Sequence, residues 1–204
     1  MVKRKIIQKR ERGFSLREQY SLSWKFIKES SNFTFAIILI FLLFLIVGFF
    51  IPLPESMVNQ LLQFIKDLIS QTEGLSTFGL IKFIFVNNLF SSLQGMILGI
   101  FLGIVPVISA LSNGFILGFV ARLSVSTTGI ASLWRIFPHG IFELPAVFIS
   151  LGMGMKLGTF IFKKEKLNSL GEYFFNSLRV FVFVIVPLLI VAAIIESFLI
   201  VLSV

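Results

Sequence analysis

"FIFVNNLFSSLQGMILGIFLGIVPVISALSNGFILGFVA", residues 83–121, holds no charged side chain between Lys82 and Arg122. As one helix this stretch would extend roughly 58 Å at 1.5 Å per residue, about twice the ~30 Å hydrocarbon core of a bilayer. The chain must therefore fold back within it. Pro106 is the expected break, because proline removes a helical amide and clashes with the preceding turn. We predict spans at about 84–104 and 107–123, the second of them short.

Three other apolar stretches are long enough to span a membrane: 33–53, about 141–161 and about 179–202. Hydrophobic residues make up 56% of the chain and charged residues 14%, whereas soluble domains are about 45–50% apolar and about 25% charged. The sequence therefore predicts an all-α, polytopic integral membrane bundle of about five transmembrane helices.

Basic residues suggest the orientation of the spans. Residues 1–29 carry nine Lys or Arg against three Glu, and "KKEK" at 163–166 separates the last two spans. Cytoplasmic loops are enriched in Lys and Arg, so we expect a multi-pass protein of the plasma membrane with a cytoplasmic N-terminus. A basic arm before a span favours anionic lipid over nucleic acid as its partner. Whether 124–140 crosses, re-enters or lies on the outer surface stays open.

Two segments have the pattern of amphipathic helices. We divide the chain into 1–32, a basic arm with an interfacial helix, and 33–204, a single transmembrane domain with an outer amphipathic helix at about 55–70. In the first helix, Leu16, Tyr20, Trp24 and Ile27 share one face. The second is too polar to span because of Lys66 and Asp67, and its apolar face either docks a partner or membrane or packs on the protein's own spans. That face comprises Val58, Leu61, Leu62, Ile65, Leu68 and Ile69.

Small residues recur at every fourth position in the second, third and fourth spans. Such rows allow helix backbones to approach closely in lipid, so we expect these three spans to form a tight central cluster. The rows are Ser91, Gly95, Gly99 and Gly103; Ala110, Gly114 and Gly118; and Ala146, Ser150, Gly154 and Gly158.

The stretch "FPHGIFELPAVF", residues 137–148, combines His139 and Glu143 with two prolines. In a helix His139 and Glu143 would share a face at i, i+4, and Pro145 should break the helix. Two interpretations stay open: the pair satisfies backbone groups freed by Pro145, or it binds a cation, proton or substrate. Glu196 is a second intramembrane acid, and Arg122, Arg135, Lys156 and Arg179 are its candidate partners.

The order of these motifs resembles the stage II sporulation protein M family over roughly residues 16–202. The matching motifs are "FVNNL" with Asn87 and Asn88, "LSNGFILGF" with Asn113, Gly114 and Gly118, "PHGIFELPA" with His139, Gly140, Glu143, Leu144 and Pro145, and "SLGMGMKLG". The resemblance implies an integral membrane fold. In spore-forming bacteria it also implies a membrane partner of envelope-remodelling proteins that degrade peptidoglycan, rather than the hydrolase itself.

Several chemistries are disfavoured by composition. One histidine and no cysteine provide too few ligands for zinc, and the HExxH, GxSxG and phosphate-loop motifs are missing from the sequence. We therefore expect no enzymatic activity, no cofactor and no resident metal. The favoured function is a membrane scaffold or a subunit of an envelope-remodelling complex. The alternative is a transporter or permease-like subunit. Expected partners are the lipid bilayer, membrane or envelope proteins and a second copy of the chain, and not nucleic acid.

Overall fold

The computed structural model describes residues 15–135 and 137–203, and every regular element in this part is helical. Five helical segments are long and apolar enough to cross a membrane, which confirms the predicted all-α class and the number of spans. The elements are α2 (Leu16–Glu29), α3 (Ser31–Phe50), α4 (Glu55–Ser70), α5 (Thr77–Ile97), η1 (Leu98–Ile100), α6 (Ile104–Thr128), η2 (Ile130–Arg135), α7 (Phe137–Gly158), η3 (Thr159–Phe162), α8 (Lys166–Val180), η4 (Phe181–Ile185) and α9 (Val186–Ser203).

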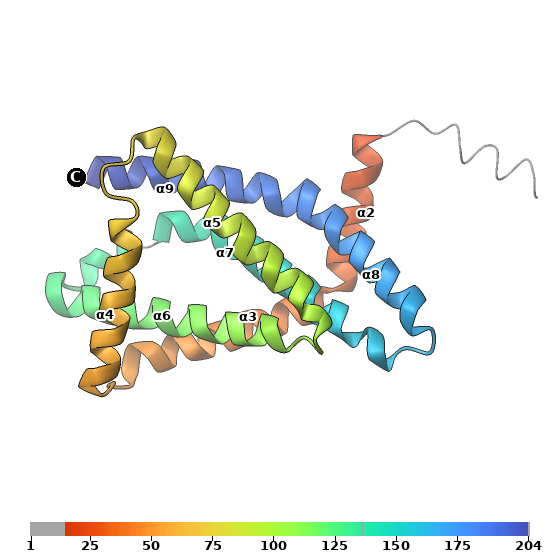
Figure 1. Cartoon of the computed structure of the whole chain (residues 1–204), viewed down its shortest axis with the longest axis horizontal. Coiled ribbons are helices and arrows are strands. Elements are labelled where there is room, and N and C mark those ends of the chain that lie inside the picture. The colour runs from red at the N-terminus through yellow and green to blue at the C-terminus, as the bar shows by residue number, and fades with distance from the viewer. Residues whose placement is uncertain (1–14, 136, 204) are drawn as a thin grey trace, which may run out of the picture.

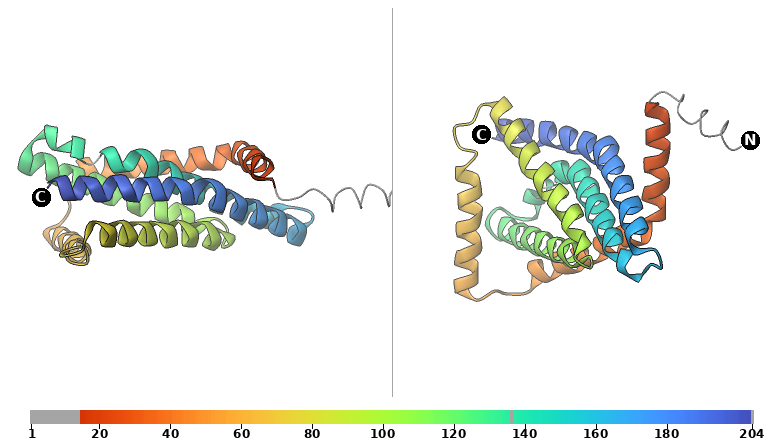
Figure 2. Two further views of the ribbon diagram at one scale, coloured as in Figure 1. Left: turned by 90° about the horizontal axis from the view of Figure 1, so that it is seen from above. Right: turned by 45° about the vertical axis from the view of Figure 1, so that its right-hand side comes forward.

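The spans run back and forth along the long axis of the molecule, and α2 and α4 lie across its two ends (Figure 1). Figure 2 shows the same arrangement from two other directions, with α4 crossing one end of the bundle. Successive spans alternate in direction, so α5 and α7 are parallel and α9 is antiparallel to both. The C-terminal end of the chain lies at the α4 end, opposite α2.

The turn between α5 and α6 falls a few residues before the expected break. Leu102 and Gly103 adopt φ values of 59° and 73°, and this left-handed pair reverses the chain. Pro106 instead lies buried in the first turn of α6, where a missing amide costs little because that amide has no helical partner. The predicted boundaries were therefore wrong by several residues, and α6, with 25 residues, is long enough to cross.

Residues 124–140 form no additional crossing in the described part of the chain. The helix α6 extends to Thr128 and ends at Gly129, whose φ of 85° favours glycine. The short η2 follows at the α4 end of the bundle before α7 begins (Figure 1). The stretch is thus largely the end of one span and the start of the next.

The helix that carries the predicted fifth span begins at Lys166, well before residue 179, because α8, the π-helical turn η4 and α9 follow one another without a break. In η4 the Val186 amide bonds to the Phe181 carbonyl, which is the i→i+5 pattern of a widened turn. Pro187 lies immediately beyond. A proline ring crowds the carbonyl four residues earlier, and the widened turn just before Pro187 relieves that crowding.

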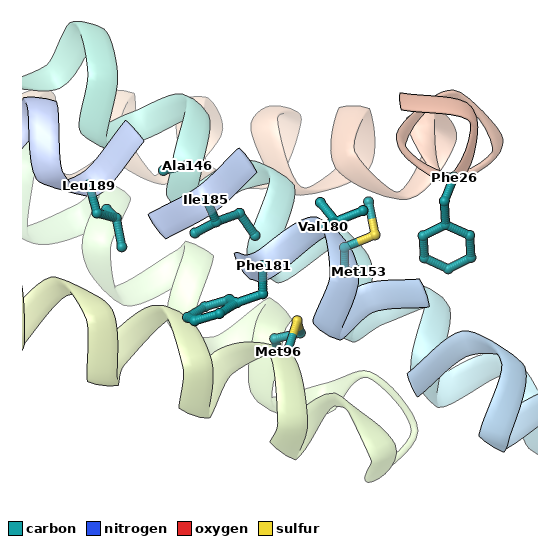
Figure 3. Close-up of a cluster of buried hydrophobic side chains, with 8 residues drawn as sticks. All are labelled: Phe26, Met96, Ala146, Met153, Val180, Phe181, Ile185 and Leu189. Atoms are coloured by element: carbon teal, nitrogen blue, oxygen red, sulfur yellow. The ribbon is translucent and has the colours of Figure 1, made fainter. Parts of the chain in front are cut away.

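The main core lies where α5, α7 and α9 meet, with Phe26 of α2 at its edge (Figure 3). Its central side chains are Met96, Met153, Ile185 and Leu189, each fully buried. A second cluster joins α3 and α6 to α7 through Ile37, Phe41, Ala110 and Leu151. Many other large apolar side chains are exposed on the outward faces of the spans, as expected where lipid is the solvent.

The small-residue rows pair differently from the expected cluster of three neighbouring spans. The α5 row packs against the α7 row. A Cβ added at Gly158 would lie 2.6 Å from the carbonyl oxygen of Gly99, and a Cβ added at Gly154 would lie 2.6 Å from the carbonyl oxygen of Gly95. The α6 row instead packs on the first span. There Gly114 and Gly118 abut the backbone of Phe41 and Leu45. The bundle therefore consists of an α3–α6 pair and an α5–α7–α9 group, joined through α7.

Candidate intramembrane polar site

Three buried helix faces converge on Glu143. On α7, Glu143 lies three residues before the fully buried Ala146 and so on the same inward face. On α9, Glu196 follows the buried residues Leu189, Ala192 and Ala193 by seven, four and three positions, so it lies on the same inward face of the helix. The sequence thus directs an acid from each of two helices into the contact between them.

Within this contact, Asn88 of α5 lies within hydrogen-bonding reach of the Glu143 carboxyl, and the Glu196 carboxyl is close enough to repel its charge. The Oε2 atom of Glu196 is buried and has no hydrogen-bond partner. One turn along α5 from Asn88, Ser92 is 2% exposed and its hydroxyl also has no partner. The two acids therefore lie in one region of the α7–α9 contact, where an unsatisfied charge is costly.

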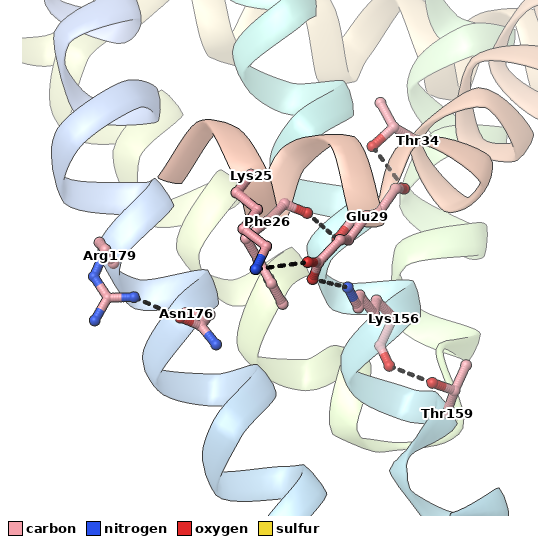
Figure 4. A network of polar contacts seen from close by, with 9 residues as sticks. Lys25, Phe26, Glu29, Thr34, Lys156, Thr159, Asn176 and Arg179 are labelled. Atoms are coloured by element: carbon pink, nitrogen blue, oxygen red, sulfur yellow. Dashed lines mark hydrogen bonds and ion pairs between the residues drawn. The ribbon is translucent and has the colours of Figure 1, made fainter. Parts of the chain in front are cut away.

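The cations proposed as partners of Glu196 bond elsewhere. Arg122 donates to the Ile51 carbonyl at 3.0 Å, and Arg179 donates to Gln19 at 2.9 Å and to Asn176. Lys156 pairs with Glu29 at 3.8 Å (Figure 4). The Arg135 side chain lies outside the described residues. Among the ion pairs of the described residues, none involves Glu143 or Glu196.

The helix does not break at Pro145, contrary to expectation, and α7 is continuous from Phe137 to Gly158. Pro145 deprives the Ile141 carbonyl of its helical donor. Both residues are exposed, Ile141 by 63%, so this carbonyl lies on the outward face of α7, nearly opposite Glu143. Glu143 is therefore not positioned to satisfy this carbonyl.

The other predicted polar residues do not join this site. Asn87 is exposed, and the exposed Asn113 donates to the Ser109 carbonyl of its own helix at 2.8 Å. A Cβ added at Gly140 would contact only Leu144 of its own helix. The His139 side chain lies outside the described residues. The expected His139–Glu143 pair therefore stays a prediction.

Serines that were not predicted as site residues extend the polar contacts along the three helices. Ser150 of α7 donates to the Ser92 carbonyl of α5 at 2.7 Å, and Ser197 of α9 is fully buried with an unpartnered hydroxyl. The signal was available, because Ser92 follows Asn88 by one helical turn and Ser150 follows Glu143 by two.

A second buried charge was also placed differently from expectation. Lys156, predicted from the sequence as a candidate partner of Glu196, is 7% exposed. Its ammonium lies 4.0 Å from the centre of the Phe26 ring and 5.4 Å from that of Tyr173. Together with the Glu29 ion pair in Figure 4, this aromatic cage fixes α2 to α7 and α8.

The described residues contain no cluster of three or more His, Cys, Asp or Glu side chains that could hold a metal ion. A comparison with protein families matches the chain to stage II sporulation protein M over residues 37–199. The matched range includes Asn88, Glu143 and Glu196 and excludes α2. Comparisons with curated proteins and with solved structures gave no match.

Proposed function

The chain belongs to the stage II sporulation protein M family, and we propose that it is a non-enzymatic membrane scaffold that holds an envelope protein at the outer end of its bundle. The observation that carries this proposal is α4. This helix of 16 residues has no buried residue, and it packs along its length on no other described helix.

The apolar face of α4 is available to a partner. Met57, Phe64 and Ile69 are 53%, 48% and 53% exposed, whereas the predicted docking residues Val58, Leu61 and Ile65 are half-buried. Leu61 and Met57 also line a shallow hollow against Phe115 of α6. The chain therefore covers one side of the apolar face and leaves the other uncovered.

The polar residues of α4 favour a protein over a lipid surface. Helices that lie on membranes are rich in Lys and Arg on their polar face, whereas α4 carries only Lys66 against Glu55 and Asp67. The remaining polar side chains are mostly uncharged amides, such as Asn59 and Gln63. The partner we propose is a membrane-anchored envelope protein that presents an amphipathic helix with an uncharged polar edge. Family resemblance supports the same class of partner.

The proposal predicts a plasma-membrane protein with α2 and the basic segments in the cytoplasm, which places α4 outside. The test is purification of the tagged protein in mild detergent at native expression. The variant Phe64→Ser/Leu68→Ser should lose a stoichiometric, membrane-anchored partner that the wild type retains. Lys66→Ser, on the polar face of the same helix, should retain it. Recovery of the wild-type chain alone, or equal recovery of every partner by the apolar variant, would refute the proposal.

Transport is the second candidate, and the Glu143–Glu196 contact is the observation that favours it, because intramembrane acids commonly mark ion pathways. It predicts that Glu143→Gln abolishes solute flux into reconstituted vesicles while the protein still folds. Unchanged flux in that variant would exclude Glu143 from the mechanism.

A further inference from the structure

We propose that α2 binds anionic phospholipid at its end of the bundle. Its apolar stripe, Leu16, Tyr20 and Trp24, enters the lipid leaflet, and the cations Arg17 and Lys28 contact the lipid phosphates. The sequence predicts only that this helix lies at the interface. The structure adds which side of the helix faces lipid and which cations select the lipid charge. The inference does not rest on the partner proposed for α4.

The first argument is the part of α2 that the protein leaves uncovered. The helix lies across the end of the bundle (Figure 1), and one side of it is fixed there. Ser23 and Phe26 are buried, and Gln19 accepts a hydrogen bond from Arg179 at 2.9 Å. The three residues of the apolar stripe, on the neighbouring side, are 58%, 50% and 58% exposed. Tyr and Trp with an apolar neighbour are the side chains that membrane proteins place at the lipid–water interface.

The second argument is the position of charge around α2. Counted at about 100° per residue from Tyr20, the cations Arg17 and Lys28 lie roughly 60° and 80° around the helix. The acids Glu18 and Glu29 lie roughly 160° and 180° around it. The cations therefore border the apolar stripe, and the acids lie on the far side. A helix whose apolar face is flanked by cations is suited to an anionic leaflet.

The third argument is that these two cations are available to a phosphate. Each ion pair among residues 15–135 and 137–203 involves Glu29 (Figure 4) and neither Arg17 nor Lys28. The Lys28 ammonium lies 5.8 Å from the centre of the Trp24 ring, which holds its charge at the edge of the stripe. A cation in this position can meet a lipid phosphate in a charge-assisted hydrogen bond while the ring contacts the lipid chain.

The loop between η3 and α8 repeats the combination at the same end of the bundle (Figure 1). Phe162 and Leu167 are 80% and 81% exposed, and the segment 163–166 between them carries three lysines and one glutamate, all exposed. Exposed apolar side chains beside cations are the pattern of a surface that meets an anionic leaflet. A soluble anion would require the cations alone, so the apolar stripe favours lipid.

The test uses the full-length chain in vesicles of equal amounts of phosphatidylcholine and phosphatidylglycerol, with one of the two lipids brominated in its acyl chains. Trp134→Phe leaves Trp24 as the only tryptophan, and bromine quenches its fluorescence. If that variant does not fold, the difference between wild type and Trp24→Phe gives the same quantity. Both leaflets have one composition, so the result does not depend on the orientation of the chain. We expect phosphatidylglycerol to be enriched around Trp24 by roughly fivefold or more, and the enrichment to vanish in about 1 M salt.

Arg17→Ser and Lys28→Ser should each reduce this enrichment by about threefold. Lys25→Ser, an equal change of charge at an exposed position farther around the same helix, should retain it. Quenching of Trp24 with no preference for phosphatidylglycerol would overturn the proposal. So would the absence of quenching by either brominated lipid. Protection of Trp24 from aqueous acrylamide in that case would show that protein, and not lipid, covers the stripe.

Discussion

The contact between α5 and α7 makes a quantitative prediction at Gly154. A Cβ added there would lie 2.6 Å from the Gly95 carbonyl oxygen, 2.8 Å from Cγ of Pro106 and 3.0 Å from the Met96 carbonyl oxygen. Ordinary contact begins near 3.4 Å, so α5 and α7 must separate by about 0.8 Å. Two of the obstructing atoms are backbone oxygens, which move only when the whole helix moves.

Gly154→Ala should therefore destabilise the bundle. Overpacking costs typically about 1–3 kcal/mol, and a backbone clash lies at the upper end of that range. Alanine recovers about 1 kcal/mol of helix propensity relative to glycine, which leaves a net loss of about 2 kcal/mol. Gly171 provides the matched control, because it is also helical and a Cβ there would meet nothing within 4 Å. Gly171→Ala should stabilise by about 0.5–1 kcal/mol.

The assay is reversible unfolding of both variants by sodium dodecyl sulfate in mixed micelles, followed by circular dichroism. The two variants should differ by about 3 kcal/mol, a ratio of folding constants on the order of 100. Wild-type stability in Gly154→Ala would refute the close α5–α7 contact. Equal destabilisation by Gly171→Ala would show that the effect arises from any alanine, not from the contact.

Three further predictions follow from single contacts. Lys156→Ala should lower the free energy of unfolding by about 1–2 kcal/mol and speed proteolysis after α2, because it removes a buried ammonium that contacts two aromatic rings and one carboxylate. Lys25→Ala, at an exposed position, should have neither effect. Ser150→Ala should cost about 0.6–1.7 kcal/mol in the same unfolding assay, because it removes an interhelical hydrogen bond. Because the chain has no cysteine, Phe64→Cys should react with an impermeant maleimide in intact cells while Leu167→Cys should not; the reverse pattern would invert the proposed orientation.

The count of spans could be predicted from the sequence because it depends on local hydrophobicity, whereas the turn between two of them could not be located. Pro106 was the most visible breaker in 83–121, but proline is compatible with the first turn of a helix as well as with its end. Leu102 carries the left-handed φ of the actual turn, and a leucine gives no signal for that conformation.

The sequence also could not predict which helices pack against each other. The row of small residues at Ala110, Gly114 and Gly118 showed that α6 approaches another backbone closely, but nothing in its spacing specified α3 rather than α5 or α7. In the same way Glu143 and Glu196 were each recognised as intramembrane acids. Their meeting depends on the offset between α7 and α9, which only the packed structure fixes.

That meeting gives Glu196 a testable energetic role. Two like charges in a low-dielectric interior repel each other, which opposes the packing of α9 against α7 in the region of Glu143 and Glu196. Glu196→Gln removes this repulsion and keeps the shape of the side chain. The variant should therefore unfold at a higher concentration of sodium dodecyl sulfate than the wild type. A variant less stable than the wild type would mean that the glutamate charge itself stabilises the bundle.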